Sequence, residues 1–535
     1  MMGHATKHPP RRCFVRPAVT ASLICGALCG CARDEPQSEP DTRPNFLWIV
    51  WDTVRADHLS LYGHTNPTTP FLEQWAGDAR VFDNCLSVSS TTAPSHASMF
   101  TGLMPTEHTT DNTRAYLPSD ANTLAERLHA GGYQTYLFSA NPYISPAHNF
   151  TQGFDLAEHP WSPKYEQDAL RIVRQKVPAH DRSSELPQKL AAGQLSVWTI
   201  KACGQLTLTG VESWLATRDQ QRPYFVFLNY MEAHRPYIPP EKYRRRMMTP
   251  QQVTRSYQID RGWLPIWEYT FGLREYSRAD LEVVAATYDA AIAELDDLLK
   301  DLLTSLQAKG LLDNTVVILT SDHGEHLGEK HMLDHQFSLY QPLLRVPLVI
   351  HYPPRFQPGR DRRPVMNHDL FPTLLTLAGI DPPPGSSTQP VSLLAPLDTR
   401  NRIAEYPSPM ARPIDTVLQA HRNWDPSPWQ RSLRSITDDR FKYIWASDGR
   451  HELYDLRIDP QERGNIIHLE TEATQRLADT LDSAVKAYHQ PDFAPAPTGT
   501  LSEQERQRLG AMGYLDEQPD QTSPEEVPTS RPTPP

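Results

Sequence analysis

The chain has 535 residues, which is enough for one large α/β domain and a smaller second one. Its formal net charge is −12 at pH 7, with 52 Lys and Arg against 64 Asp and Glu. Such an acidic chain argues against nucleic acid as a partner, and an anionic substrate would need local cations, a metal ion or Arg and His side chains.

The first thirty residues have the pattern of an export signal. Basic residues precede an apolar run at 17–28, which is too short to span a membrane comfortably as a helix. The run ends in Leu28-Cys29-Gly30-Cys31, which resembles a bacterial lipobox. We therefore expect cleavage before Cys31, lipidation of Cys31 and a flexible tether at 31–43. The protein would then reach the membrane through its lipid anchor, on the extracytoplasmic side of the cell envelope; an uncleaved membrane anchor is the alternative.

Residues 44–395 alternate between strand and helix patterns. Apolar runs with the composition of fully buried strands lie at 45–51, 133–138, 223–229, 315–320 and 344–350. Helical patterns lie between them, at 68–79, 117–128 and 280–306. In the last of these, the acidic pair Asp296-Asp297 is interpreted as a solvated face. The alternation predicts an α/β domain with a large mixed, mostly parallel sheet sandwiched by helices.

Residues 396–495 predict a small C-terminal α+β subdomain. Strand-like alternation at 431–456 is broken by Asp448-Gly449, which is a hairpin signal. A helix is expected at 471–489, packed on that hairpin. Residues 496–535 end in a run rich in proline and are expected to be mostly disordered.

Polar side chains stand at the expected strand ends or in the turns after them. Asp52 follows the first strand, His234 follows the strand at 223–229, and Asp322-His323 follows the strand at 315–320. Thr92 begins a Ser/Thr-rich segment with the look of a helix N-terminus, where free amides attract anions. Each residue alone fits a helix cap or a structural histidine. Their joint placement at one edge of one sheet points to a site.

Several motifs in order along the chain resemble the sulfatase family of the alkaline phosphatase superfamily, from about residue 43 to 465. The matching stretches are 51–63, 92–102, 229–237, 320–325, 344–348, 369–375 and 452–456. The resemblance implies that Asp52, Thr92, Asp322 and His323 bind one divalent cation (Mn²⁺, Zn²⁺, Mg²⁺ or Ca²⁺). It also implies that Thr92 is the nucleophile and that His234 binds the anionic group or assists the leaving group. Further candidates for substrate binding are His96, Arg235 and His335.

The chain departs from the family's pattern at three points. The family's nucleophile is a Cys or Ser oxidised to formylglycine in Cys/Ser-x-Pro-Ser-Arg, and here Thr92 and His96 stand at its first and last positions. The secondary hydroxyl of threonine cannot give the aldehyde. The family's paired aspartates are Asp52 and Thr53, and its Lys-Trp-His segment has no counterpart around residues 139–142. A Thr nucleophile beside one metal looks like the phosphotransferase branch of the superfamily, which includes lipoteichoic acid synthases and phosphoethanolamine transferases.

We therefore expect an exported, metal-dependent hydrolase or transferase that cleaves an anionic ester through attack by Thr92, with phosphoryl chemistry favoured on mechanistic grounds. One alternative is a sulfuric ester hydrolase that acts without formylglycine, and another is a surface binding protein whose catalytic machinery has decayed. Cys85 and Cys203 could pair in an oxidising compartment, but two residues do not establish a disulfide.

Overall fold

A computed structural model describes residues 42–183, 196–383, 390–396, 399–489, 491–494 and 501–514. Its main sheet has eight strands in the order β12-β2-β11-β7-β1-β6-β4-β5. They are β1 (Asn45–Trp51), β2 (Arg80–Phe82), β4 (Gln134–Ser139), β5 (Leu156–Glu158), β6 (Tyr224–Tyr230), β7 (Thr315–Thr320), β11 (Leu348–His351) and β12 (Gly359–Asp361). Only β11 runs antiparallel to its neighbours within this sheet. The predicted mixed, mostly parallel sheet is confirmed.

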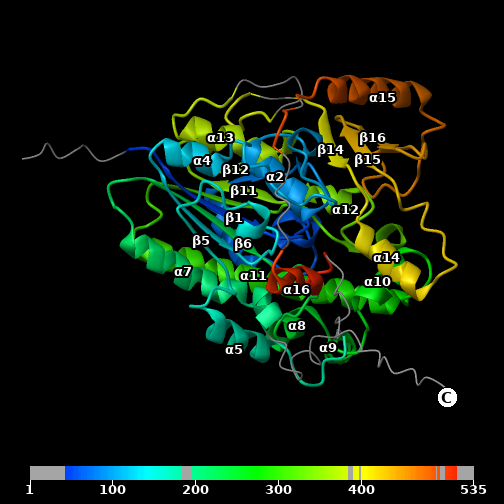
Figure 1. Ribbon diagram of the computed structural model, residues 1–535, viewed down its shortest axis with the longest axis horizontal. Helices are drawn as coiled ribbons and strands as arrows, with labels where there is room; N and C mark the ends of the chain where they lie inside the picture. Colours follow the sequence, from blue (N-terminus) through cyan, green and yellow to red (C-terminus); the bar gives the residue numbers. More distant parts are fainter. Residues whose placement is uncertain are drawn as a thin grey trace, which may run out of the picture. The chain divides into compact units, whose positions relative to one another are not determined.

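Helices cover both faces of this sheet, which explains why its central strands are apolar throughout (Figure 1). One layer contains α2 (Thr92–Thr101), α4 (Leu124–Ala130) and α13 (Leu370–Leu377). The other contains α7 (Cys203–Thr217) and the long α11 (Arg278–Ala308). The remaining helices of the large domain are α1 (Pro70–Trp75), α3 (Pro105–His108), α5 (Glu166–Lys176), α8 (Glu241–Met247), α9 (Pro250–Ser256), α10 (Trp263–Thr270) and α12 (Gln341–Leu344).

Short strands complete the large domain. β3 (Cys85–Leu86), β10 (Arg345–Val346) and β13 (Val365–Met366) form a three-stranded sheet, and β8 (His326–Leu327) pairs with β9 (Leu333–Asp334).

Cys85 and Cys203 are both buried and both free thiols. No helix within the described ranges is long and apolar enough to cross a bilayer.

The C-terminal region forms its own antiparallel sheet in the order β14-β15-β16-β17. Its strands are β14 (Arg402–Tyr406), β15 (Leu433–Thr437), β16 (Phe441–Ala446) and β17 (Glu452–Asp455), and α14 (Ala411–Ala420) lies between the first two in sequence. Helix α15 (Thr471–Lys486) packs against this sheet through Leu477 and Leu481, which share an apolar cluster with Ile436. The turn at Asp448-Gly449 joins β16 to β17, as its hairpin signal indicated.

Two local predictions are wrong. The helix expected at 117–128 begins only at Leu124, because Thr123 caps it: Thr123 Oγ1 accepts from the Glu126 amide at 3.1 Å. Asp296 is fully buried, not solvated. Its carboxylate accepts from the amides of Phe71 and Leu72 at 2.8 and 2.9 Å, so this side chain of α11 caps the neighbouring helix α1.

Part of the expected disordered tail is helical. Helix α16 (Glu503–Ala511) begins with a capping box in which Ser502 and Glu505 satisfy each other's amides. The chain then continues to Tyr514, whose side chain is buried. The expectation of disorder is therefore wrong for residues 501–514. The predicted signal peptide, Cys31 and the tether up to residue 41 lie outside the described residues, as does the chain after Tyr514.

Candidate active site

The carboxyl ends of β7, β1, β6 and β4 bring polar side chains together at one edge of the main sheet. Asp52 follows β1 directly, and Asp322 comes two residues after β7, its parallel neighbour. Asn229 near the end of β6 and Asn141 just after β4 lie on the other side of Asp52. All four side chains are fully buried. Parallel strand order thus produces the cluster that the sequence pattern predicted.

Thr92 is the first residue of α2 and is buried beside this cluster. Its Oγ1 lies 3.2 Å from His323 Nε2. Ser95 anchors the helix to the loop after β7, because its Oγ donates to the Asp322 carbonyl oxygen at 2.7 Å. Asn367 Nδ2, from outside the helix, donates to the same oxygen at 3.2 Å. The hydroxyl is therefore positioned by a buried network at a helix N-terminus, where an anion is favoured.

The Asp52 carboxylate is held by two amides and leaves one oxygen unpaired. Its Oδ2 accepts from Asn141 Nδ2 at 2.8 Å and from Asn229 Nδ2 at 3.2 Å, while Oδ1 has no hydrogen-bond partner among the described residues. Burial, followed by repulsion from Asp322, raises the pKa of Asp52 to about 7.

Asp322 has the same arrangement. Its Oδ1 accepts from the amides of Thr53 and His323 at 3.1 and 2.9 Å, and its Oδ2 accepts no hydrogen bond from any described group. Burial raises the pKa of Asp322 to about 6. Thr53 Oγ1 is a third buried oxygen without a partner in the described part of the chain. Adjacent buried carboxylates with unpaired oxygens are costly unless a cation lies between them.

These unpaired atoms fit a divalent cation. One donor atom each from Asp52, Asp322 and His323 lies within 4.8 Å of the others. His323 Nδ1 donates to the Gly324 carbonyl oxygen at 2.9 Å, and burial lowers the pKa of His323 to about 3, so the ring is neutral with its lone pair on Nε2. Thr92 Oγ1 completes a set of oxygen and nitrogen donors that suits Mn²⁺, Zn²⁺, Mg²⁺ or Ca²⁺.

His96 supports this cluster from the side of α2. Its Nδ1 donates to the Thr92 carbonyl oxygen at 3.1 Å and lies 3.5 Å from Asp322 Oδ2. The ring packs edge-on against Phe100 and Phe227, and burial lowers the pKa of His96 to about 3. The structure brings this candidate to the site as a neutral side chain among Thr92, Asp322 and aromatic rings.

Two more predicted histidines face the same space. His234 Nδ1 donates to the Arg235 carbonyl oxygen at 2.7 Å, which leaves the Nε2 lone pair directed at the site. Its pKa is lowered well below 6.5, by burial and then by the neighbouring His335 charge. Burial by itself would lower the pKa of His335. Asp334, whose Oδ1 lies 2.8 Å from His335 Nδ1, and Glu325 outweigh burial and raise the pKa of His335 to about 10. His335 is thus a cation beside the His323 and His234 rings.

Arg235 is engaged elsewhere. Its Nη2 lies 3.0 Å from Asp334 Oδ2, its Nη1 donates to the Arg261 carbonyl oxygen at 3.3 Å, and its guanidinium stacks 4.2 Å from the Trp263 ring centre. The structure therefore places this predicted substrate-binding residue behind Asp334, in support of the carboxylate that charges His335.

Tyr514 is a site residue that the sequence reasoning missed. Its hydroxyl donates to His234 Nε2 at 3.0 Å and lies 3.4 Å from Thr92 Oγ1 and 3.5 Å from Asn141 Nδ2. The ring stacks on Tyr143 with centroids 4.2 Å apart. The available signal was a capping box at 502–505 followed by the apolar run Leu509-Gly-Ala-Met-Gly-Tyr514, which predicts a docked helix in place of a solvated tail.

Asn141 and Asn229 were also missed as site residues, although both stand at strand ends in the sequence. Their amides orient Asp52, and Asn229 Nδ2 lies 3.4 Å from His96 Nε2. A polar residue at the end of a predicted buried strand was the signal for Asn229.

Comparison with known proteins found two matching families. The family described as Sulfatase matches residues 44–380, and the family described as N-sulphoglucosamine sulphohydrolase, C-terminal, matches residues 328–490. N-acetylglucosamine-6-O-sulfatase of Bacteroides thetaiotaomicron is 25% identical over 517 residues, covering 83% of this chain and 86% of that protein. Arylsulfatase K of Xenopus laevis is 25% identical, covering 84% and 83%. The crystal structure of the phosphonate monoester hydrolase of Agrobacterium radiobacter shares the fold, with a TM-score of 0.63, 22% identity and coverage of 84% and 96%.

Proposed function

Because the chain belongs to the sulfatase family and is an ester hydrolase, we propose that it cleaves an anionic ester by attack of Thr92 on the central phosphorus or sulfur atom. The observation that carries this proposal is the position of Thr92 Oγ1, 3.2 Å from His323 Nε2, among buried oxygens that have no partner within the described ranges. A hydroxyl beside buried, unpaired carboxylate oxygens adds little to the stability of the fold, but it is well positioned to act as a nucleophile.

In the proposed reaction, Thr92 Oγ1 forms a bond to phosphorus or sulfur while the bond to the ester oxygen breaks and the alcohol leaves. Water then attacks the same atom, releases the inorganic anion and restores the hydroxyl. A divalent cation held by Asp52, Asp322, His323 and Thr92 would neutralise charge on the transferring group and favour the alkoxide. Protonated His335 pairs with the anionic group. His234 Nε2 is placed to exchange a proton with a substrate oxygen.

Phosphate esters or diesters are the substrates that this site favours. A phosphorylated Thr92 is hydrolysed by the same in-line displacement that formed it. A sulfated threonine has no aldehyde hydrate to expel its group, because threonine cannot give formylglycine. Sulfate esters are the second candidate, supported by relatives that are named as sulfatases for N-acetylglucosamine 6-O-sulfate and aryl sulfates.

The test is turnover of aryl phosphate, aryl phosphodiester and aryl sulfate by the purified protein with added Mn²⁺, Zn²⁺, Mg²⁺ or Ca²⁺. Thr92→Ala should abolish turnover, whereas Thr91→Ala is the matched control, because the adjacent Thr91 hydroxyl is buried but makes no capping bond. Mass spectrometry of a quenched reaction should show a phosphate on Thr92. Preferred turnover of the sulfate, or a phosphate on another residue, would refute the phosphoryl mechanism.

We also infer that substrate binding displaces residues 501–514. The Tyr514 hydroxyl lies between Thr92 Oγ1 and His234 Nε2, at 3.4 and 3.0 Å, where a substrate oxygen has to be. With Tyr514 in place, Thr92 is 1% exposed and His234 is fully buried. Two groups cannot occupy one position, so the described conformation is closed to substrate.

Attachment to the envelope is proposed from the sequence. Lipidation of Cys31 would hold the enzyme at the extracytoplasmic face, where its substrate would be an extracytoplasmic anionic ester. Cys31→Ala should release the protein from membranes in fractionation, while Cys29→Ala should leave it attached. Release by neither change would mean a different anchor.

A further inference from the structure

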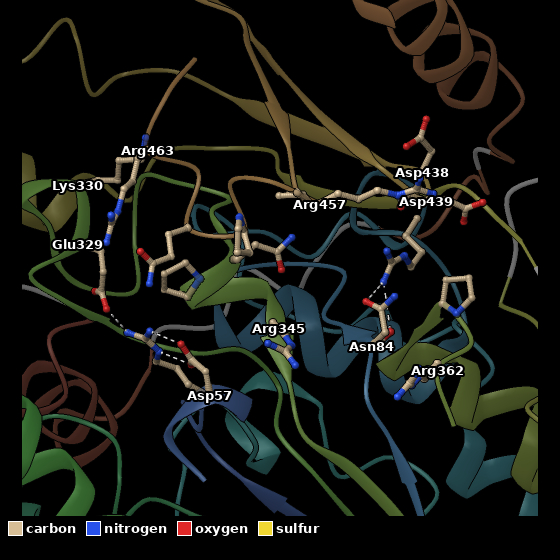
Figure 2. A pocket seen from close by; sticks show the side chains of 18 residues that line it. Asp57, Asn84, Glu329, Lys330, Arg345, Arg362, Asp438, Asp439, Arg457 and Arg463 are labelled. Carbon is tan, nitrogen blue, oxygen red and sulfur yellow. Dashed lines mark hydrogen bonds and ion pairs between the residues drawn. The ribbon is translucent and has the colours of Figure 1, made fainter. Parts of the chain in front are cut away.

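A polar cavity lies between loops of the large domain and the C-terminal four-stranded sheet (Figure 2). Its volume is about 720 Å³, which is within the usual range for a small-molecule site. Figure 2 shows Arg345 and Arg362 on the wall from the large domain and Arg457 on the opposite wall, after β17. None of the side chains that line this cavity belongs to the Thr92 site.

The cavity carries an excess of positive charge in an acidic chain. Seven of its lining side chains are Lys or Arg and four are Asp or Glu. Arg55 is already neutralised, because Asp57 Oδ2 and Glu329 Oε1 lie 2.8 and 2.7 Å from its guanidinium nitrogens. Of the other lining residues, Arg362 pairs with Asp83 at 3.9 Å and Asp438 pairs with Arg476 at 2.6 Å. Among the described residues, five lining cations then remain against one acid, Asp439. Low-dielectric walls lined by one sign of charge concentrate counter-ions.

Arg402 is a buried cation of this cavity without a carboxylate. It is 4% exposed, and its Nη1 donates to the carbonyl oxygen and Oδ1 of Asn84 at 3.2 and 2.6 Å. Within the described ranges its Nε has no hydrogen-bond partner and no carboxylate forms an ion pair with it. Burial, followed by repulsion from Arg400, lowers the pKa of Arg402 to about 10. An unpaired buried guanidinium is expensive, and a bound anion would offset that cost.

Arg345 and Arg457, on opposite walls of the cavity, also lack a carboxylate partner among the described residues. Arg345 Nη2 donates to the Asp83 carbonyl oxygen at 3.3 Å, and Arg457 Nε donates to the Asp439 carbonyl oxygen at 3.4 Å. Neither guanidinium forms an ion pair with a carboxylate in the part of the chain that the structure describes. Each therefore retains N–H groups that match the oxygens of sulfate, phosphate or carboxylate.

We propose that this cavity binds a small polyanion, a molecule that carries more than one sulfate or phosphate group, at a site distinct from the ester that Thr92 attacks. Arg402 and Arg345 hold one oxyanion from the side of β14 and β10, and Arg457 holds another from the segment after β17. A ligand in this position joins the large domain to the C-terminal sheet, so its binding stabilises the fold.

The test measures binding of two probes to the full chain by isothermal titration calorimetry: a disulfated glucosamine and a bisphosphorylated hexose. Arg345→Gln and Arg457→Gln remove cavity cations that are not deeply buried, so both variants should fold. Arg278→Gln is the matched control, because its side chain is 93% exposed, lies outside the cavity and loses the same charge. A Thr92→Ala,His335→Ala variant removes anion binding at the catalytic site.

The double variant Arg345→Gln,Arg457→Gln should bind the better probe at least tenfold more weakly, and each single variant should bind it more weakly than Arg278→Gln, which should stay within twofold of the parent. Binding should persist in the Thr92→Ala,His335→Ala variant, and the probe should raise its melting temperature. The tighter of the two probes identifies the ligand as sulfated or phosphorylated. Unchanged affinity in the cavity variants, or binding that disappears only with the catalytic-site changes, would overturn the proposal. These results do not depend on turnover, so failure of the Thr92 mechanism would leave them readable.

Discussion

Replacing Tyr514 by phenylalanine removes one hydroxyl from the closed site and keeps the ring stacked on Tyr143. The hydroxyl donates to His234 Nε2 at 3.0 Å, and the change leaves that nitrogen buried without a donor. A buried acceptor that loses its partner costs about 1–3 kcal/mol. The closed conformation should lose this amount relative to the open one, in which water reaches His234.

This loss predicts the direction and size of the kinetic effect. If Tyr514 blocks the site as proposed, substrate binds only the open conformation, and its apparent affinity is scaled down by the fraction of molecules that are open. A shift of about 1–3 kcal/mol raises kcat/KM by roughly 5- to 150-fold, as long as the closed form still predominates. Tyr514→Ala also removes the stacked aromatic pair, worth about 0.5–1.5 kcal/mol beyond burial, and should raise kcat/KM further.

The assay is initial-rate hydrolysis of the best aryl ester, with kcat and KM determined separately for each variant. Tyr352→Phe is the matched control, because it deletes a tyrosine hydroxyl that bonds Asn314 at the surface, 3.3 Å away. The rise in kcat/KM should appear mainly as a lower KM, with kcat little changed. A fall in kcat with unchanged KM for Tyr514→Phe would show that the hydroxyl takes part in the chemistry and would refute the blocking role.

Three further predictions follow from the buried carboxylates and the nucleophile. Thr92→Ser should keep turnover within about tenfold of the parent, whereas Thr92→Ala should lose at least about 10³-fold, measured with the same esters; equal rates for both would exclude Thr92 as nucleophile. Folded Asp52 and Asp322 have pKa values of about 7 and 6, above the 3.8 of a free carboxyl, so in the metal-free protein these two groups hold more protons when folded than when unfolded. Their contribution to stability should therefore be lost as the pH rises from 4 to 7. Added Mn²⁺ or Zn²⁺ should reverse that trend in thermal melts and Asp52→Asn should flatten it, while identical melting curves with and without metal would argue against the site. Asp296→Ala should destabilise the fold by about 1–3 kcal/mol in urea unfolding, because the amides of Phe71 and Leu72 at the start of α1 lose their acceptor, and the exposed Asp301→Ala should not.

Local pattern was enough to predict the scaffold and most of the side chains that meet at the candidate site. Continuous apolar runs identified the strands β1, β6 and β7. A strand covered by helices on both faces has no solvent-facing side, so its side chains on both faces are apolar. A polar residue at the end of such a strand, or in the turn after it, falls at the carboxyl edge of a parallel sheet, so Asp52, His234 and Asp322 were found without coordinates. Thr92 was found by its place at a helix start within a family motif.

Long-range contacts decided the rest. Nothing near Tyr514 in sequence encodes Thr92 or His234, which lie more than 270 residues away, and only folding places the C-terminal segment over them. Arg235 follows a strand end, as His234 does. Its guanidinium nevertheless forms a buried ion pair with Asp334 and so does not face the site. Asp296 lies on the polar face of α11, but α1 packs over it and takes its carboxylate as a cap. Sequence periodicity sets which face of an element is apolar, whereas the partner of each buried polar group depends on which distant segment packs against it.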